Sequence, residues 1–184
     1  MRRRRLFAGV ELDDATRSAC AAAALSLEHT GFLAKYEAPE KLHVTLAFLG
    51  YVEAERVAAV RATLAAIASR FAPFAVSLDK LGAFPHERRP RIVFVGSRAQ
   101  GAAFRTLAVA LRDAYRELGF AFEEDAVAHV TIARVKEPKR PLPHVDLAAI
   151  RMPVQSLVLF ESLPDPANRT TRYETMARAP LTGR

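Results

Sequence analysis

A short repeat with the alternation of a β-strand limits the folds open to this chain more than any other pattern in it. Residues 43–50 read HVTLAFLG and residues 129–134 read HVTIAR. The chain contains 5 His, and its composition predicts only about 0.07 copies of His-apolar-Thr-apolar by chance. Two matched copies therefore predict two equivalent strands, one in each half of the chain.

The segments around the two motifs follow a common order of strands and helices. Helices are predicted over 13–31, where Asp13 or Asp14 can cap the first turn, over 53–71 and over 100–119. Strands are predicted at 5–12, 32–38, 41–50, 74–84, 91–97, 126–135, 154–162 and 170–179. The pattern predicts an α+β fold of two similar lobes, each contributing one His-x-Thr-x strand, and by symmetry the two strands would face each other across a cleft. The connections between strands allow either strand direction, so the pattern leaves the pairing order open. We expect residues 1–184 to form a single bilobal domain.

Composition narrows the class of protein further. Hydrophobic residues make up 51% of the 184 and charged residues 26%, which is typical of a globular chain with its own core. The single cysteine, Cys20, lies in a predicted helix and is expected in the core, so a disulfide framework and a multi-cysteine zinc site are excluded. No export signal or membrane span is visible, and we expect a cytoplasmic protein.

The net charge of +7 favours a polyanionic partner such as RNA. A codon bias toward arginine would give a similar charge, because 22 of the basic residues are Arg and 5 are Lys. The basic residues cluster at Arg2 to Arg5, at 86–91 and at 136–140.

Alternation along a strand places His43, Thr45 and Ala47 on one face and Val44, Leu46 and Phe48 on the other. In the second copy, by the same rule, His129, Thr131 and Ala133 oppose Val130 and Ile132. Each strand would then pack its aliphatic face on a helix and present His beside Thr on the opposite face.

Two imidazoles and two hydroxyls suit transfer of a phosphodiester. One neutral histidine can accept a proton from the nucleophile while the other, protonated, donates to the leaving oxygen. The threonines can stabilise charge on the non-bridging oxygens. A purely structural role for the motif and a zinc site are the alternatives. No His-Glu-x-x-His or cysteine pair is present, and we expect neither metal nor cofactor.

The other histidines have simpler explanations. His29 ends a predicted helix, where a cation is favourable, and His86 and His144 lie in loops beside prolines. His86 is a weaker candidate for contact with substrate because its loop is basic.

These motifs resemble the two-histidine (2H) phosphoesterase superfamily, and specifically its RNA 2′,3′-cyclic phosphodiesterase branch, also called LigT-like 2′-5′ RNA ligases. The supporting stretches are RLFAGVEL, PEKLHVTLAFLG, LGAFPHERRPRIVFVG, AHVTIARV, SLVLFES and RYETMARAPL. The resemblance implies a bilobal α+β fold of two pseudo-symmetric lobes, with antiparallel-rich sheets flanked by helices and one His-x-Thr-x strand per lobe facing a central cleft. It also implies metal-independent hydrolysis of an RNA terminal 2′,3′-cyclic phosphate to a 2′-phosphate, with weak reverse 2′-5′ ligation. It implies that His43 and His129 are catalytic, with His43 as the acid and His129 as the base. It also implies phosphate binding by Thr45, Thr131 and Arg134.

Some positions depart from the family pattern. Tyr36 stands where relatives commonly have Trp, and Ala128 stands where they often have Pro. Strict alternation would point Arg134 away from His129, so a bulge or the strand end would have to redirect it. Phe48 occupies the equivalent place in the first copy, and we expect it in the core.

Other functions remain open at this point. The same site could act on 2′-5′ oligonucleotides or on a small cyclic nucleotide, and a non-catalytic RNA-binding module is an alternative of a different class. RNA with a 2′,3′-cyclic phosphate end is the expected partner. We expect no association with a membrane, and we expect a monomer.

Overall fold

The structure is a computed structural model that describes residues 3–137, 139–167 and 170–183. Arg2 and Pro138, which belong to the predicted basic clusters, lie outside the described residues. In chain order the elements are β1 (Arg3–Glu11), α1 (Asp14–His29), β2 (Lys35–Tyr36), the 3-10 helix η1 (Pro39–Lys41), β3 (His43–Glu53), the 3-10 helix η2 (Ala54–Arg56), α2 (Val57–Ala68), β4 (Phe74–Leu78), β5 (Lys80–Phe84), β6 (Ile92–Gly96), α3 (Ala102–Glu117), β7 (His129–Arg134), β8 (Ile150–Val154), β9 (Ser156–Asp165) and β10 (Thr170–Pro180).

The predicted helices form, α1 and α3 within two residues of the expected ends, whereas the first turn of the helix predicted over 53–71 is the 3-10 helix η2 and α2 ends at Ala68. Asp13 caps α1, its side chain accepting from the Thr16 amide at 3.0 Å, and Gly31 follows with φ of 70°. Cys20 is fully buried within α1, as expected. His29 lies in the last turn of α1, as the sequence predicts.

Several predicted strands differ from the structure. The segment 32–38 supplies only the two residues of β2. The strand predicted to stop at Gly50 continues to Glu53, because Gly50 adopts φ of 69° at a register shift against β1 and lets the pairing resume. The single strand predicted at 74–84 divides into β4 and β5, which join different sheets. Strand β8 was not predicted.

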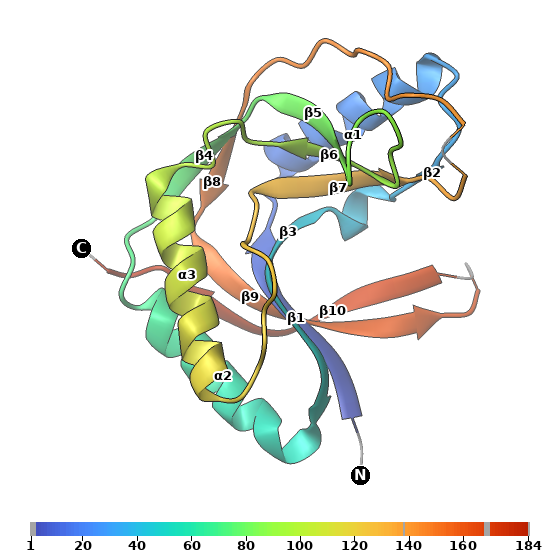
Figure 1. Ribbon diagram of the computed structural model, residues 1–184. Helices are drawn as coiled ribbons and strands as arrows, with labels where there is room; N and C mark the ends of the chain where they lie inside the picture. The colour runs from blue at the N-terminus through green and yellow to red at the C-terminus, as the bar shows by residue number, and fades with distance from the viewer. Residues whose placement is uncertain (1–2, 138, 168–169, 184) are drawn as a thin grey trace.

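One twisted, eight-stranded sheet organises the chain, in the order β10-β9-β1-β3-β7-β6-β5, with β2 paired to β7. Strands β4 and β8 form a separate pair. Each of these pairings is antiparallel. The α+β, bilobal prediction is confirmed, and the two motif strands β3 and β7 are neighbours at the centre of the sheet (Figure 1).

Two of the helices, α1 and α3, connect the two halves of the molecule, because each packs on a strand of the other half. The units β1–α1–β3 and β6–α3–β7 each consist of an antiparallel strand pair connected through a helix. Helix α1 nevertheless contacts β7, and α3 contacts β3, so each helix packs on the motif strand of the other unit. Helix α2 packs beside α3 and against β9 and β10 (Figure 1). The core beneath the motifs contains Val44, Leu46, Val130 and Ile132, all fully buried.

Candidate active site

The two motifs meet at a pseudo-two-fold position in the sheet. Strands β3 and β7 are antiparallel and pair at Val44 and Val130, the middle of each His-Val-Thr sequence. In that register His43 lies across from Thr131, and Thr45 lies across from His129. The structure thus brings the four predicted side chains together on one face of the sheet, opposite the buried valines.

A β-bulge follows each motif at the same place. In β3, Thr45 pairs with Gly9 and Ala47 with Ala8, so Leu46 is the additional residue. In β7, Thr131 pairs with Phe94 and Ala133 with Val93, so Ile132 is the additional residue. The two strands therefore share one pattern of exposed and buried positions over six residues.

The bulges correct two expectations from strict alternation. Ala47 and Ala133 are fully buried and do not share a face with the histidines. Phe48 is 48% exposed and lines the cleft, so its predicted place in the core is wrong. Arg134 is turned to the same cleft by its own bulge.

The two bulges are held by different donors. The carbonyl of Leu46 accepts from Arg112 Nε on α3 at 2.6 Å. The carbonyl of Ile132 accepts from the backbone amide of Glu37, beside β2, at 2.8 Å. In each bulge, the additional residue leaves one buried carbonyl without a partner in the strand ladder, and a donor from another part of the chain binds it.

Backbone carbonyls fix the orientation of both imidazoles. Nδ1 of His43 lies 2.6 Å from the carbonyl oxygen of Lys41, and Nδ1 of His129 lies 2.8 Å from that of Val127. A carbonyl oxygen only accepts, so Nδ1 carries the proton in each ring. The free lone pair of each neutral ring is then on Nε2, which is the atom available for proton transfer.

Aromatic rings pack around both histidines. The His43 ring lies 4.8 Å from Phe7 and 5.0 Å from Tyr173, centroid to centroid. The His129 ring lies 5.2 Å from Phe84 and 5.3 Å from Phe94. These contacts remove water from one side of each imidazole and restrict its rotation.

Burial lowers the pKa of both histidines below the ordinary value of 6.5. For His43 the bond to the Lys41 carbonyl opposes this effect in part, and the charge of His129 lowers the pKa further. For His129 the bond to the Val127 carbonyl opposes it, and the charge of Arg134 lowers the pKa further. Both imidazoles are therefore neutral in the free protein at pH 7.

All five predicted site residues line one cleft of about 340 Å³. They are His43, Thr45, His129, Thr131 and Arg134. The cleft opens between β7 and β2 on one side and the β9–β10 hairpin on the other (Figure 1). Its volume suits a nucleotide-sized ligand.

Several cleft residues carried no recognisable signal in the sequence. Glu37 binds Arg134 through an Oε1–Nε ion pair of 2.7 Å, and thereby orients the guanidinium. Lys41 Nζ donates to Thr170 Oγ1 at 3.0 Å, which links η1 to β10 across the cleft wall. Lys35 also lines the cleft. Tertiary pairing of β2 with β7 brings Lys35 and Glu37 to the motifs, and no local pattern indicates it.

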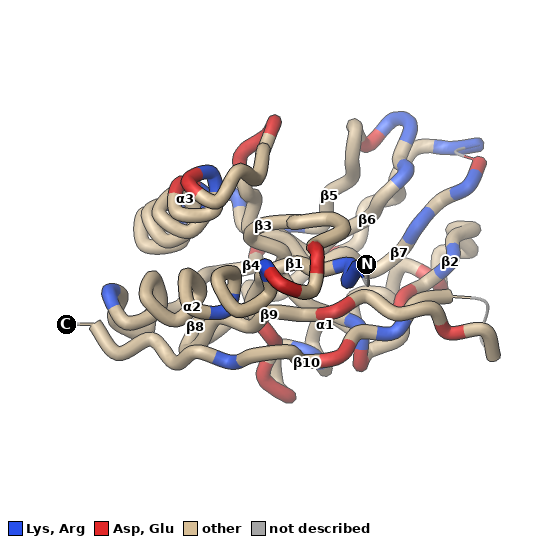
Figure 2. The backbone as a smooth tube through the Cα atoms, turned by 90° about the horizontal axis from the view of Figure 1, so that it is seen from below, with Lys and Arg blue, Asp and Glu red and all other residues tan. Residues whose placement is uncertain are grey.

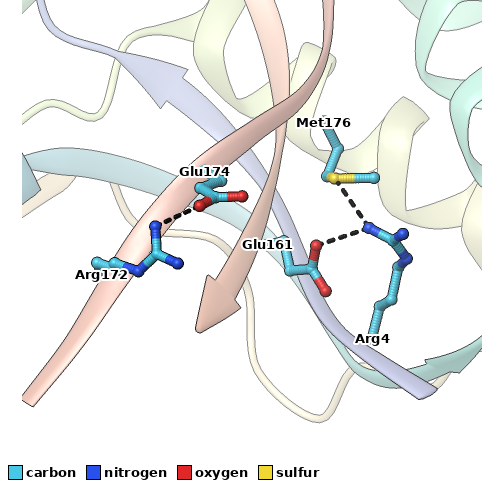
Figure 3. A network of polar contacts seen from close by, with 5 residues as sticks. All are labelled: Arg4, Glu161, Arg172, Glu174 and Met176. Atoms are coloured by element: carbon cyan, nitrogen blue, oxygen red, sulfur yellow. Dashed lines mark hydrogen bonds and ion pairs between the residues drawn. The ribbon is translucent and has the colours of Figure 1, made fainter. Parts of the chain in front are cut away.

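The predicted basic clusters contribute unequally to the cleft. Of the described N-terminal arginines, Arg5 lines it, whereas Arg3 is paired with Glu53 and Arg4 with the buried Glu161 at 2.7 Å. Figure 3 shows the guanidinium of Arg4 in contact with both Glu161 and Met176. His86 does not line this cleft.

The cluster at 136–140 borders an adjoining hollow. That hollow shares Lys35 and Arg134 with the cleft and also contains Lys136, Lys139 and Arg140. Figure 2 shows basic residues along the segments around β2, β5, β6 and β7. Five basic residues and one acidic residue, Glu137, therefore border the hollow beside the motifs.

Neither a metal-ligand cluster nor a membrane-spanning helix occurs in the described ranges. No group of three His, Cys, Asp or Glu side chains is arranged there as a set of metal ligands. None of the helices in the same part of the chain has the length and apolar character needed to span a membrane.

Known proteins share both the repeat and the fold. A family model described as LigT like Phosphoesterase matches residues 10–94 and 95–168, one segment for each motif. The chain is 36% identical to the RNA 2′,3′-cyclic phosphodiesterase of Archaeoglobus fulgidus over 132 residues, covering 72% of this chain and 73% of that protein.

Two solved structures agree with the family match. A crystal structure of a Thermus thermophilus protein has a TM-score of 0.86 and 30% identity, covering 97% of this chain and 98% of that chain. The crystal structure of E. coli LigT complexed with 3′-AMP has a TM-score of 0.78 and 25% identity, covering 98% and 99%. This chain belongs to the LigT-like phosphoesterase family.

Proposed function

We propose that this protein hydrolyses the 2′,3′-cyclic phosphate at an RNA end to a 2′-phosphate, by acid-base catalysis from His43 and His129 without a metal ion. The observation that carries the proposal is the pair of His-Val-Thr motifs around the Val44–Val130 bridge, with each Nδ1 held by a backbone carbonyl. The Archaeoglobus relative bears the name of this activity.

The chemistry follows from two imidazoles that flank one phosphate. Nε2 of His129 accepts a proton from water as the water oxygen bonds to phosphorus. Nε2 of His43, in its protonated form, donates to O3′ as the P–O3′ bond breaks. The product has a 2′-phosphate and a 3′-hydroxyl, and the two histidines have exchanged protonation states. Transfer of a proton between them through solvent restores the starting form.

The remaining polar groups stabilise the phosphate. The hydroxyls of Thr45 and Thr131 donate to the non-bridging oxygens, where charge increases in the transition state. Arg134, held by Glu37, adds a cation at the same centre. The anionic substrate also favours protonation of one neighbouring imidazole, which supplies the acid that the free protein lacks at pH 7.

The same groups account for a weak 2′-5′ ligation. A 5′-hydroxyl of a second RNA replaces water as the nucleophile, the P–O3′ bond breaks as before, and a 2′-5′ phosphodiester forms. The basic hollow beside the cleft favours an RNA chain over a small cyclic nucleotide.

We further propose that residues 1–184 act as one bilobal domain and as a monomer. Each unit relies on the helix of the other to cover its motif strand, and residues from both halves of the chain line one cleft.

The test is incubation of a short RNA ending in a 2′,3′-cyclic phosphate, with EDTA present, followed by identification of the product end. A 2′-phosphate supports the reaction, its regiochemistry and its independence of metal. A 3′-phosphate would refute the assigned bond cleavage. Binding without turnover would favour the RNA-binding module.

A further inference from the structure

We propose that Glu37 is a positioning residue that makes His43, rather than His129, the histidine that carries the proton when the cyclic phosphate binds. This role rests on the proposed function, because it concerns the acid of that reaction. It explains how two pseudo-symmetric motifs can have a fixed acid and a fixed base. It also gives a function to a residue outside the His-Val-Thr sequences.

Glu37 is the one acidic side chain among the described residues that line the cleft. Four cations line the same cleft and suit an anionic substrate; they are Arg5, Lys35, Lys41 and Arg134. A carboxylate at this place repels the substrate and offsets part of the charge of Arg134. The Glu37 side chain is only 18% exposed, so it is not an ordinary solvated surface group. A carboxylate that opposes substrate binding indicates a function in the reaction itself.

Strand β2 breaks the symmetry of the two motifs beside β7 (Figure 1). Glu37 follows β2 directly, and its amide donates to the carbonyl of Ile132 in the second bulge at 2.8 Å. Its Oε1 accepts from Arg134 Nε at 2.7 Å. In the first bulge the corresponding carbonyl, that of Leu46, binds Arg112 instead. Backbone and side chain together therefore fix a carboxylate at one end of an otherwise two-fold arrangement.

The side-chain charges around the two imidazoles differ as a result. Burial is the largest influence on the pKa of both histidines and lowers both. Among the charges that act on His43, those of His129 and Arg134 lower the pKa as well, whereas the Glu37 carboxylate raises it. Arg134 lowers the pKa of His129, and no carboxylate among the described residues opposes it. These charges favour His43 over His129 as the site of the proton.

The other groups packed against His43 do not compete with Glu37. Three of them are the rings of Phe7, Phe160 and Tyr173, on β1, β9 and β10. Glu11 of β1 lies across from His43 in the strand register, but it forms an ion pair with Arg178 at 2.5 Å. Lys41 of η1 is bound to Thr170 Oγ1 on β10.

The groups around His129 are aromatic or cationic. The rings of Phe84 on β5 and Phe94 on β6 pack against it. Lys80 of β5 has its Nζ 5.7 Å from the centroid of the Phe94 ring. Lys35 of β2 pairs with Arg134 in the register and lines the cleft with it. A positive charge beside an imidazole disfavours its protonation, so these cations act in the same direction as the carboxylate beside His43.

This asymmetry sets the direction of proton transfer. The anionic phosphate favours one additional proton on the imidazole pair when it enters the cleft. Glu37 directs that proton to Nε2 of His43, which donates it to O3′ as the P–O3′ bond breaks. His129 remains neutral, and its Nε2 accepts the proton that water loses as the water oxygen bonds to phosphorus. After turnover, the same carboxylate favours return of the proton from His129 to His43.

An NMR titration of the free protein tests this role without substrate or turnover. Glu37→Gln removes the charge but keeps an Oε1 acceptor for Arg134 Nε. The imidazole Cε1–H signals are assigned from the spectra of His43→Asn and His129→Asn. In Glu37→Gln the titration of His43 should move to lower pH, and by more than that of His129. An unchanged titration of His43, or an equal shift of both histidines, would overturn the inference.

Glu40→Gln is the matched control for the titration. Glu40 lies in η1, the next element after Glu37, is exposed and does not line the cleft. Its substitution also removes one negative charge from the chain, but it should leave both histidine titrations unchanged. A shift of His43 as large as that in Glu37→Gln would show that net charge, and not the position of Glu37, is responsible.

The pH dependence of kcat/KM separates the charge of Glu37 from its contact with Arg134. On a short RNA ending in a 2′,3′-cyclic phosphate, the high-pH limb reports loss of the acidic proton and should move to lower pH in Glu37→Gln. Glu37→Asp keeps the charge and should keep the wild-type limb, although its shorter side chain holds Arg134 less well and lowers kcat. A lower kcat in Glu37→Gln with an unchanged pH profile would refute the inference. If the wild type did not hydrolyse this RNA, the proposed function would fail, and the NMR titration would still decide the role of Glu37.

Discussion

Arg112 provides a sharp test of how the cleft is built. Arg112→Met removes the guanidinium that binds the carbonyl of Leu46 at 2.6 Å, while the methionine keeps the apolar stem. Leu46 is fully buried, so water cannot replace the lost donor. Arg112 also donates to the Glu124 carbonyl, which is on the surface and can bind water instead.

The loss of one charge-assisted bond to a buried carbonyl predicts a decrease of about 2 kcal/mol in the free energy of unfolding. For a chain of this length that corresponds to a fall of about 4–8 °C in Tm. Urea denaturation at pH 7 measures the change. The activity should fall too, because the bulge that loses its support directly follows His43 and Thr45 on β3.

Arg116→Met is the matched control for this prediction. Arg116 lies one turn further along α3 than Arg112. The guanidinium carbon of Arg116 lies 5.6 Å from the centroid of the Phe122 ring, and that of Arg112 lies 5.2 Å from the same centroid. It pairs with the exposed Asp113 side chain, so its loss should cost less than about 0.5 kcal/mol. Equal effects of the two substitutions, or a loss below about 0.5 kcal/mol for Arg112→Met, would refute the role assigned to the Leu46 carbonyl.

Four further predictions concern the motifs and the strand beside them. His43→Asn and His129→Asn should each lower kcat about 10²- to 10⁴-fold without changing the circular dichroism spectrum. The double variant should have a kcat little lower than that of the less active single variant, and near-normal turnover by either single variant would contradict the paired mechanism. Because burial lowers both histidine pKa values, kcat/KM should be bell-shaped in pH with its maximum below 6.5, so a flat profile between pH 6.5 and 8 would count against two titrating imidazoles. Because both pKa values are lower in the folded state, the folded protein binds fewer protons than the unfolded chain. The stability that the two neutral histidines contribute is therefore complete above pH 6.5 and decreases as the pH falls through their folded pKa values. Urea titrations at pH 7 and pH 5 should show a smaller loss of stability in each His→Asn variant than in the wild type. Gly9→Ala should lower the free energy of unfolding by about 1–3 kcal/mol, because the added Cβ would lie 2.2 Å from the Val44 carbonyl oxygen and push β1 away from β3 beside the first motif. An unchanged urea midpoint would show that the two strands are not packed so closely.

Local pattern was sufficient for most helices and strands. The Asp13 cap, the helical patterns over 53–71 and 100–119, and the alternation of β7 are all short-range signals, and each element formed near its predicted position. Prediction failed where neighbouring strands set the geometry. The continuation of β3 through Gly50 depends on pairing with β1, and the division at Asp79 depends on β5 joining β6 while β4 joins β8.

The placement of Phe48 shows the limit of alternation as a guide. Counting by two from His43 put this side chain in the core, but the bulge at Leu46 moves it to the cleft. A bulge is stabilised by what satisfies its free carbonyl. For Leu46 that donor is Arg112, 66 residues further along the chain, and no local pattern could reveal it.

The order of residues along the chain was enough to specify the two motif strands, the α+β class and the four His and Thr side chains that the strands present in pairs, because strand alternation is a local property. Three arrangements needed the folded chain: the motifs pair around Val44 and Val130, Glu37 orients Arg134, and Phe48 faces the cleft. They arise from contacts between residues distant in the chain, whose free energy depends on the packing of the whole sheet and its crossed helices.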